Sequence, residues 1–208
     1  MRLINKGNEP EELAIFNRNN AKRIVKWDDE CVPANLKPAI RKSLVIEQQG
    51  LCSYCMREIG EDCQIEHFIA RSKNQSHCWD YNNMLGVDNS RTLPLKYKNL
   101  CENGRGDKAI SINPLNPLHM QGIYYLKDGT IKHDVYQNDL NDVLKLNEPV
   151  FKAARKAKID GIDRAIAGLR TAGVPNIYVH LKQSYDPQSA FAGVESWYIS
   201  ELNKNGQI

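Results

Sequence analysis

Apolar residues recur at the spacing of an α-helix in several segments of the chain. Leu36, Ile40 and Leu44 repeat at every fourth position and share one helical face, and Gly50 follows as a stop signal. In the last quarter of the chain, a longer run of the same period ends before Pro175. The apolar pattern predicts helices over about residues 11–21, 36–49, 81–87, 148–172 and 189–203.

Two segments with short alternating patterns predict β-hairpins between these helices. In the first, a strand over residues 51–55 turns at 59–62 and pairs with the alternating segment 64–68. In the second, strands at the two ends of residues 123–133 flank Asp128-Gly129, the dipeptide that a type I′ turn prefers. The cysteines at the start of the first hairpin therefore lie in a small β-structure.

Together these elements predict an α+β fold, in which a mostly helical frame surrounds a small cysteine-bearing module. We expect residues 1–50 to form an N-terminal helical region, 51–110 the central module, and 111–208 the second hairpin and the C-terminal helices, all in one compact unit. With 208 residues, of which 41% are hydrophobic and 25% charged, the chain is typical of a soluble globular protein. It has no run of ~20 apolar residues and no secretory signal, so we expect a cytoplasmic protein without membrane contact.

The net charge of +3, from 28 Lys and Arg against 25 Asp and Glu, is too weak to attract a polyanion over the whole surface. Residues 91–108 carry five basic against two acidic side chains, a local net charge of +3. We expect this segment to contact the phosphates of a nucleic acid. The helix predicted over 148–172 has a similar excess, which is more typical of a solvated helix face.

Six cysteines are too few for a disulfide scaffold in a chain with its own core, and a reducing compartment favours metal binding or burial. Cys52 and Cys55 form a Cys-x2-Cys knuckle, whose spacing turns two thiolates toward one Zn²⁺ ion. Cys101 is the best third ligand. The fourth ligand stays open among four residues: Asp88, Cys63, Cys78 and His77.

An acid and an imidazole stand side by side at Glu66 and His67. Neighbouring strand residues point to opposite faces, so this pair acts together only where the strand bends or ends near a shared ion. Taken alone, the two residues are more typical of a solvated acid and an ordinary core or zinc-binding histidine. However, Asn83 follows sixteen residues after His67, and Cys101 comes next, so the pair belongs to a longer series of polar residues.

The order of these motifs resembles that of the HNH (ββα-metal) nucleases with a zinc knuckle. The motifs are Cys52-x2-Cys55, Glu66-His67-Phe68, the segment WDYNNML at 79–85, and Cys101 followed by RGDK at 105–108. More closely, EQQGLCSYC at 47–55 and SINP at 111–114 are similar to the HNH proteins of Septu and retron defence systems, the PtuB type. The resemblance spans roughly residues 40–160.

The resemblance implies a ββα-metal module with a role for each polar residue of the series. His67 would be the general base that draws a proton from the attacking water. Glu66 and Glu102 would hold a catalytic divalent ion, Mg²⁺ or Mn²⁺. Asn83 would fix the loop and the histidine ring by hydrogen bonds, and Arg105 would bind the scissile phosphate.

The chain departs from the family pattern at three positions. Asp88 stands where the family usually has a third zinc cysteine, so the resemblance implies a structural Zn²⁺ site of Cys52, Cys55, Cys101 and Asp88. Leu100 precedes the last cysteine in place of the usual histidine. Glu102 is not the commonest metal ligand at its position, and the neighbouring Asn103 is its rival.

The resemblance implies a metal-dependent endonuclease that cuts DNA, or tRNA or another RNA, as the effector of an antiviral defence system. Its implied partners are an ATPase of the PtuA type and, in retron systems, a reverse transcriptase with its noncoding RNA. The alternative is a catalytically inactive, zinc-stabilised subunit that binds nucleic acid or serves as an adaptor in an ATPase complex. A zinc ribbon is disfavoured because the chain has no second Cys-x2-Cys.

Overall fold

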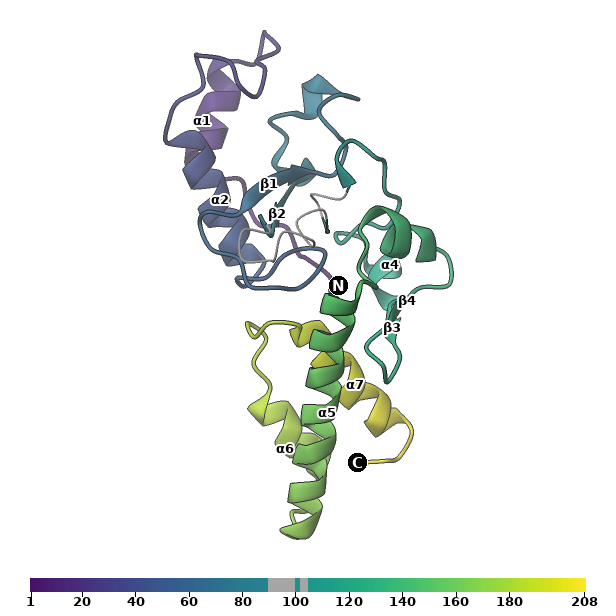
Figure 1. Cartoon of the computed structure of the whole chain (residues 1–208). Helices are drawn as coiled ribbons and strands as arrows, with labels where there is room; N and C mark the ends of the chain where they lie inside the picture. Colours follow the sequence, from purple (N-terminus) through teal and green to yellow (C-terminus); the bar gives the residue numbers. More distant parts are fainter. Residues whose placement is uncertain (90–99, 102–104) are drawn as a thin grey trace.

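The computed structural model describes residues 1–89, 100–101 and 105–208 and shows an α+β fold, as predicted. Helices of different lengths lie around two small antiparallel sheets (Figure 1). In chain order the elements are α1 (Glu11–Asn19), α2 (Leu36–Glu47), β1 (Gln64–His67), 3₁₀ turns at Gln75–His77 and Tyr81–Asn83, β2 (Met84–Val87), α4 (Pro117–Gln121), β3 (Tyr124–Tyr125), β4 (Ile131–Lys132), a π-helical turn at Asp139–Val143, α5 (Pro149–Thr171), α6 (Ile177–Ser184) and α7 (Ala192–Lys204).

The helix α2 packs on the β1–β2 sheet, and α1 packs on α2 (Figure 1). Apolar side chains of these elements form a small core. Leu36, Ile40 and Leu44 of α2 all point into this core, and each is at most 1% exposed. The helical period of these residues therefore predicted α2 correctly. Trp79 completes the same core from the long connection between β1 and β2.

The strand pairing of the first sheet differs from the prediction. β1 pairs antiparallel with β2, whereas the segment at 51–55 makes only one isolated bridge, between Leu51 and Glu58. The helix predicted over 81–87 is also wrong, because a 3₁₀ turn leads there into β2. All four residues of β2 are buried, so the strand lacks the polar alternation that distinguishes a half-buried strand from a helix.

The second hairpin is confirmed, with β3 paired antiparallel to β4. Its turn is not type I′, which needs positive φ at both central residues. Here the Gly129 N–H donates to the Leu126 carbonyl, and Gly129 has a φ of 84° while Asp128 does not have a positive φ. A side chain at Gly129 would also collide with the Lys152 carbonyl, so the glycine lets the hairpin approach α5 closely.

The C-terminal helices form the lower part of the molecule, where α5 packs against α6 and α7 (Figure 1). The predictions of α5 and α7 are confirmed, but the short helix α6 was not predicted. Arg155 of α5 is 2% exposed and donates to the Gly129 carbonyl at 2.6 Å, so it ties the helix to the hairpin. None of the described helices combines the length and the apolar composition needed to cross a bilayer.

Candidate functional site

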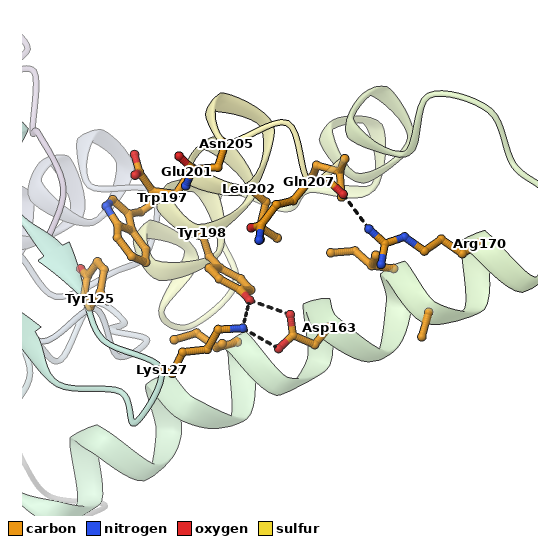
Figure 2. Close-up of a pocket in the computed structure, with 14 residues that line it drawn as sticks. Tyr125, Lys127, Asp163, Arg170, Trp197, Tyr198, Glu201, Leu202, Asn205 and Gln207 are labelled. Atoms are coloured by element: carbon orange, nitrogen blue, oxygen red, sulfur yellow. Dashed lines mark hydrogen bonds and ion pairs between the residues drawn. The ribbon is translucent and has the colours of Figure 1, made fainter.

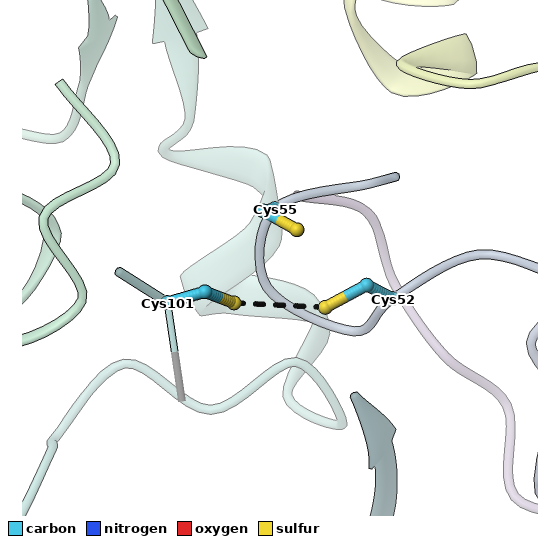
Figure 3. A group of neighbouring side chains, drawn as sticks. All are labelled: Cys52, Cys55 and Cys101. Carbon is cyan, nitrogen blue, oxygen red and sulfur yellow. Dashed lines mark hydrogen bonds between the residues drawn. The ribbon is translucent and has the colours of Figure 1, made fainter. Parts of the chain in front are cut away.

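Cys52, Cys55 and Cys101 gather at one buried point, although Cys101 lies far along the chain from the other two (Figure 3). Their sulfur atoms lie within 4.8 Å of one another, and the Cys52 and Cys101 Sγ atoms are 3.6 Å apart. Thiolates at ~2.3 Å from a tetrahedral Zn²⁺ are separated by about 3.8 Å. The trio could therefore hold a metal ion, and its spacing fits zinc.

The local backbone explains why the three sulfurs converge. The Met56 N–H donates to the Cys52 carbonyl and closes the tight turn that carries the first two cysteines. Cys101 adopts a φ of 58° and donates its N–H to the Leu144 carbonyl, which anchors the third cysteine. The unusual backbone of Cys101 marks a position that its surroundings fix.

The three thiols differ in acidity. Burial raises the pKa of Cys55 and of Cys101 well above the ordinary value. Burial also acts against ionisation of Cys52, but hydrogen bonds from the other two thiols and from the Asp88 backbone outweigh it and bring its pKa well below the ordinary value. A bound metal requires its cysteine ligands as thiolates, so it would have to offset the burial that opposes ionisation of all three.

Among the described residues, no fourth histidine, cysteine or carboxylate donor lies within 4.8 Å of all three sulfurs. The Asp88 carboxylate accepts a hydrogen bond from Arg57 Nη1 at 2.5 Å. His77 pairs with Asp80 at 3.3 Å instead of facing the cysteines. The zinc-binding role of Asp88 therefore stays a prediction, with its carboxylate held by an arginine in this structure.

Glu66 and His67 line one polar cleft of about 310 Å³. His67 is the last residue of β1, so both side chains lie at the end of this strand. Arg41, Arg71 and Asp107 also line this cleft. Since neither Arg41 nor Arg71 belongs to the basic segment found in the sequence, the positive charge here was not predicted.

His67 is held in one orientation. Its Nε2 donates to the Cys78 carbonyl at 2.9 Å, and its ring meets the Trp27 ring edge-on with 4.7 Å between centroids. Burial lowers the pKa of His67 to about 4, so the imidazole is neutral at pH 7. Because Nε2 carries the proton, Nδ1 keeps a lone pair that can accept one.

Glu66 forms a buried ion pair with Arg105. Arg105 is 2% exposed and also donates to three backbone carbonyls: those of His67, Phe68 and Lys108. The guanidinium therefore fixes the end of β1 and the carboxylate beside the cleft. Its predicted contact with the scissile phosphate stays a prediction, whereas the contacts in this structure are with the protein itself.

Asn83 ties down the connection between β1 and β2. Its Oδ1 accepts from the Ile69 N–H at 2.7 Å, and its Nδ2 donates to the carbonyls of Ile69 and His77. The predicted hydrogen bond to the histidine ring is not among these contacts, because the His67 ring donates to Cys78. Asn83 therefore acts on the loop rather than directly on the imidazole.

Several predicted residues lie outside the described part of the chain. They are Glu102, its rival Asn103, and most of the basic residues between 91 and 108. Glu66 and Asp107 are the carboxylates among the described lining of the cleft. Asp107 was not predicted as a site residue, although it stands directly in the RGDK motif at 105–108.

A second cavity of about 510 Å³ lies between α5, α7 and the β3–β4 hairpin (Figure 2). Tyr198 donates to Asp163 at 2.7 Å, and Lys127 contacts both of these side chains. Arg170 donates to the Gln207 carbonyl at 2.6 Å at the far end. Lys127, Asp163 and Tyr198 therefore bind one another, and the cavity shares no lining residue with the cleft of Glu66 and His67.

No protein-family model and no curated protein matches the chain. Its function must therefore be inferred from its own residues, namely the cysteine trio and the cleft beside His67. The two sites are linked directly, because Arg105 lies four positions after Cys101 and reaches Glu66.

Proposed function

We propose that the chain is a metal-dependent endonuclease of the HNH type, which hydrolyses phosphodiester bonds of nucleic acid. The observation that carries the proposal is the position of Glu66 and a neutral His67 in one polar cleft at the end of β1. The cysteine trio supports the second part of the proposal, a structural Zn²⁺ ion that fixes the chain next to the cleft.

His67 is neutral at pH 7 and can therefore accept a proton as the general base of this proposal, although burial makes it a weaker base than an ordinary imidazole. Its Nε2 is engaged by the Cys78 carbonyl, so Nδ1 would take the proton from a water that attacks phosphorus. The Trp27 ring and the Cys78 carbonyl fix the imidazole, which keeps Nδ1 in one direction. Arg41 and Arg71 would offset the charge of the phosphate on the wall of the same cleft.

The catalytic Mg²⁺ or Mn²⁺ ion belongs to the proposal as well. Glu66 contacts Arg105 through Oε1, and its second oxygen would serve as a ligand. Glu102 is the second ligand that the sequence predicts, and it lies outside the described residues. An ion bound there supplies charge stabilisation at the leaving 3′ oxygen.

The substrate and partners extend the same proposal. The resemblance to the PtuB type favours an antiviral effector that cuts DNA, tRNA or another RNA. It also implies a PtuA-like ATPase partner and, in a retron system, a reverse transcriptase with its noncoding RNA. The cationic side chains on the cleft wall support an anionic polymer as substrate, and we expect the protein to act in the cytoplasm.

A second candidate is a catalytically inactive adaptor with the same zinc site. One observation favours it: among the described residues, the cysteine trio is the only group of three donors close enough to share a metal ion. The Glu66–Arg105 ion pair would then be purely structural. In that case the protein binds zinc and no further divalent ion.

Cleavage and metal binding together separate the two candidates. Purified zinc-bound protein is incubated with plasmid, single-stranded DNA and total tRNA in Mg²⁺ or Mn²⁺, alone and with an ATPase of the PtuA type. Metal-dependent cutting supports the nuclease. Absence of cutting, combined with absence of Mn²⁺ binding by calorimetry in a folded protein, supports the adaptor.

A further inference from the structure

Two cationic side chains lie over the Trp27 ring, next to the cleft that contains His67. Lys37 Nζ lies 4.7 Å and Arg71 Cζ 5.5 Å from the centroid of the Trp27 ring. The same ring stacks on Trp79, with 4.6 Å between centroids and 26° between planes. This stacking fixes the indole, and the indole in turn positions both cations.

Asp28 bridges these two cations. Its Oδ1 lies 3.1 Å from Lys37 Nζ, and its Oδ2 lies 3.6 Å from Arg71 Nη1. The Asp28 side chain is 80% exposed, and ion pairs in such positions contribute little to the stability of a fold. One exposed carboxylate therefore contacts two cations that the Trp27 ring has positioned, and the three side chains together keep a net charge of +1.

The bridge adjoins the proposed catalytic cleft. Trp27, Arg71 and Asp107 line both this cleft and a neighbouring one of about 410 Å³ that contains Asp28. Trp27 also touches His67 edge-on. A polymer that places one phosphate beside His67 and continues into the neighbouring cleft would pass Arg71 and Asp28, the carboxylate of which pairs with Lys37.

We propose that Lys37 and Arg71 bind a backbone phosphate of the nucleic-acid strand, and that the Asp28 carboxylate occupies this phosphate position in the free protein. Carboxylates and phosphates accept hydrogen bonds from the same cationic donors, so each can replace the other. Asp28 can leave by a rotation about its exposed side-chain bonds. The inference rests on the proposed function, since it identifies a substrate contact of the same cleft.

The inference predicts opposite effects for the carboxylate and for the cations. Asp28→Asn removes the competing charge, so the affinity for a nucleic acid should rise about threefold at low salt, because two cations become available. Lys37→Gln combined with Arg71→Gln removes two phosphate contacts. Because both cations contact the same phosphate, this double variant should make the slope of log K against log salt shallower by about 0.7 for a single strand.

The test measures binding rather than cleavage. The full-length, zinc-bound protein is titrated against a fluorescein-labelled single-stranded oligonucleotide by anisotropy, over a salt series and without added Mg²⁺ or Mn²⁺. Glu201→Gln is the matched control, because it removes one negative charge from an exposed pair with Lys204 on α7. Circular dichroism shows whether each variant is folded, and each glutamine retains two methylene groups of the side chain that it replaces.

Tighter binding of Asp28→Asn than of Glu201→Gln, together with the shallower slope of the double variant, supports the phosphate site. Equal binding of Asp28→Asn and Glu201→Gln, or an unchanged slope, overturns it. These results do not depend on cleavage. If the protein gives both binding results but never cuts, the phosphate site is supported and the nuclease proposal is rejected. If it cuts but gives neither binding result, the nuclease proposal is supported and the phosphate site is rejected.

Discussion

Arg105 forms a buried ion pair with Glu66 and so connects the segment after Cys101 to the end of β1. The two side chains are 2% and 8% exposed as residues, which means that neither charge is well hydrated. Removing one member of such a pair leaves the other charge buried without a counterion. The position of Glu66 beside the cleft therefore depends on Arg105.

We predict that Arg105→Met lowers the free energy of unfolding by about 3–5 kcal/mol, as expected for a broken buried ion pair. Lys204→Met is the control, because Lys204 forms an exposed pair with Glu201 and should cost less than about 1 kcal/mol. Urea denaturation measures both. A similar small loss for the two variants would show that Arg105 does not hold Glu66.

We predict that the cysteine trio binds zinc and that substitution of any one of the three cysteines abolishes this binding. Cys52→Ser, Cys55→Ser or Cys101→Ser should each release the ion and lower the melting temperature, because metal binding contributes to folding. Elemental mass spectrometry measures the zinc content, and a chelator should reproduce the thermal effect. Cys31→Ser is the control, since Cys31 is exposed and should leave zinc at one ion per chain.

Asn83 is predicted to stabilise the connection between the strands through its three hydrogen bonds. Asn83→Ala leaves the Ile69 N–H and two carbonyls without this partner and should cost about 2–3 kcal/mol. Asn82 is exposed, and Asn82→Ala should cost much less. Equal thermal stability of the two variants would contradict the role of Asn83 in holding the loop.

Burial of His67 predicts a dependence of stability on pH. The pKa of about 4 in the folded protein lies below the ordinary value of 6.5, so between these two pH values the unfolded chain binds a proton that the folded protein does not bind. The stability due to the neutral ring is complete above pH ~6.5 and is lost as the pH falls toward 4. His67→Gln removes this titration, so its unfolding free energy should fall less between pH 7 and 4.5 than that of the wild type.

The parts of the fold that depend on local pattern were predictable, and those that depend on distant contacts were not. The period of Leu36, Ile40 and Leu44 fixes one buried face, so α2 follows from the sequence. The buried strand β2 has no polar alternation, and its pairing with β1 depends on tertiary contacts. The spacing of apolar residues along the chain does not indicate which strands pair.

The same distinction applies to the candidate sites. The Cys-x2-Cys spacing of Cys52 and Cys55 is a local signal, and the meeting with Cys101 was expected from the order of the motifs. By contrast, Trp27 stands in a polar segment without a motif. Its place beside His67 depends on how α1 and α2 pack on the sheet, so the sequence alone could not indicate it.

The central claim is that His67 acts as the base of a phosphodiester hydrolysis. Its side chain can be compared with that of His77, which lies nearby, is 44% exposed and pairs with Asp80. The variants His67→Ala and His77→Ala each replace one histidine side chain with a methyl group. The comparison therefore separates a role in chemistry from a general effect of losing a histidine.

The most direct measurement is the cleavage of plasmid, single-stranded DNA and total tRNA in Mn²⁺ by wild type, His67→Ala and His77→Ala, with zinc content and circular dichroism recorded for each. We predict that the cleavage rate of His67→Ala is at least about 100-fold below that of the wild type, as expected for loss of a general base, while its zinc content and fold are unchanged. His77→Ala should cleave at the rate of the wild type. Equal cleavage by His67→Ala and the wild type would contradict the account.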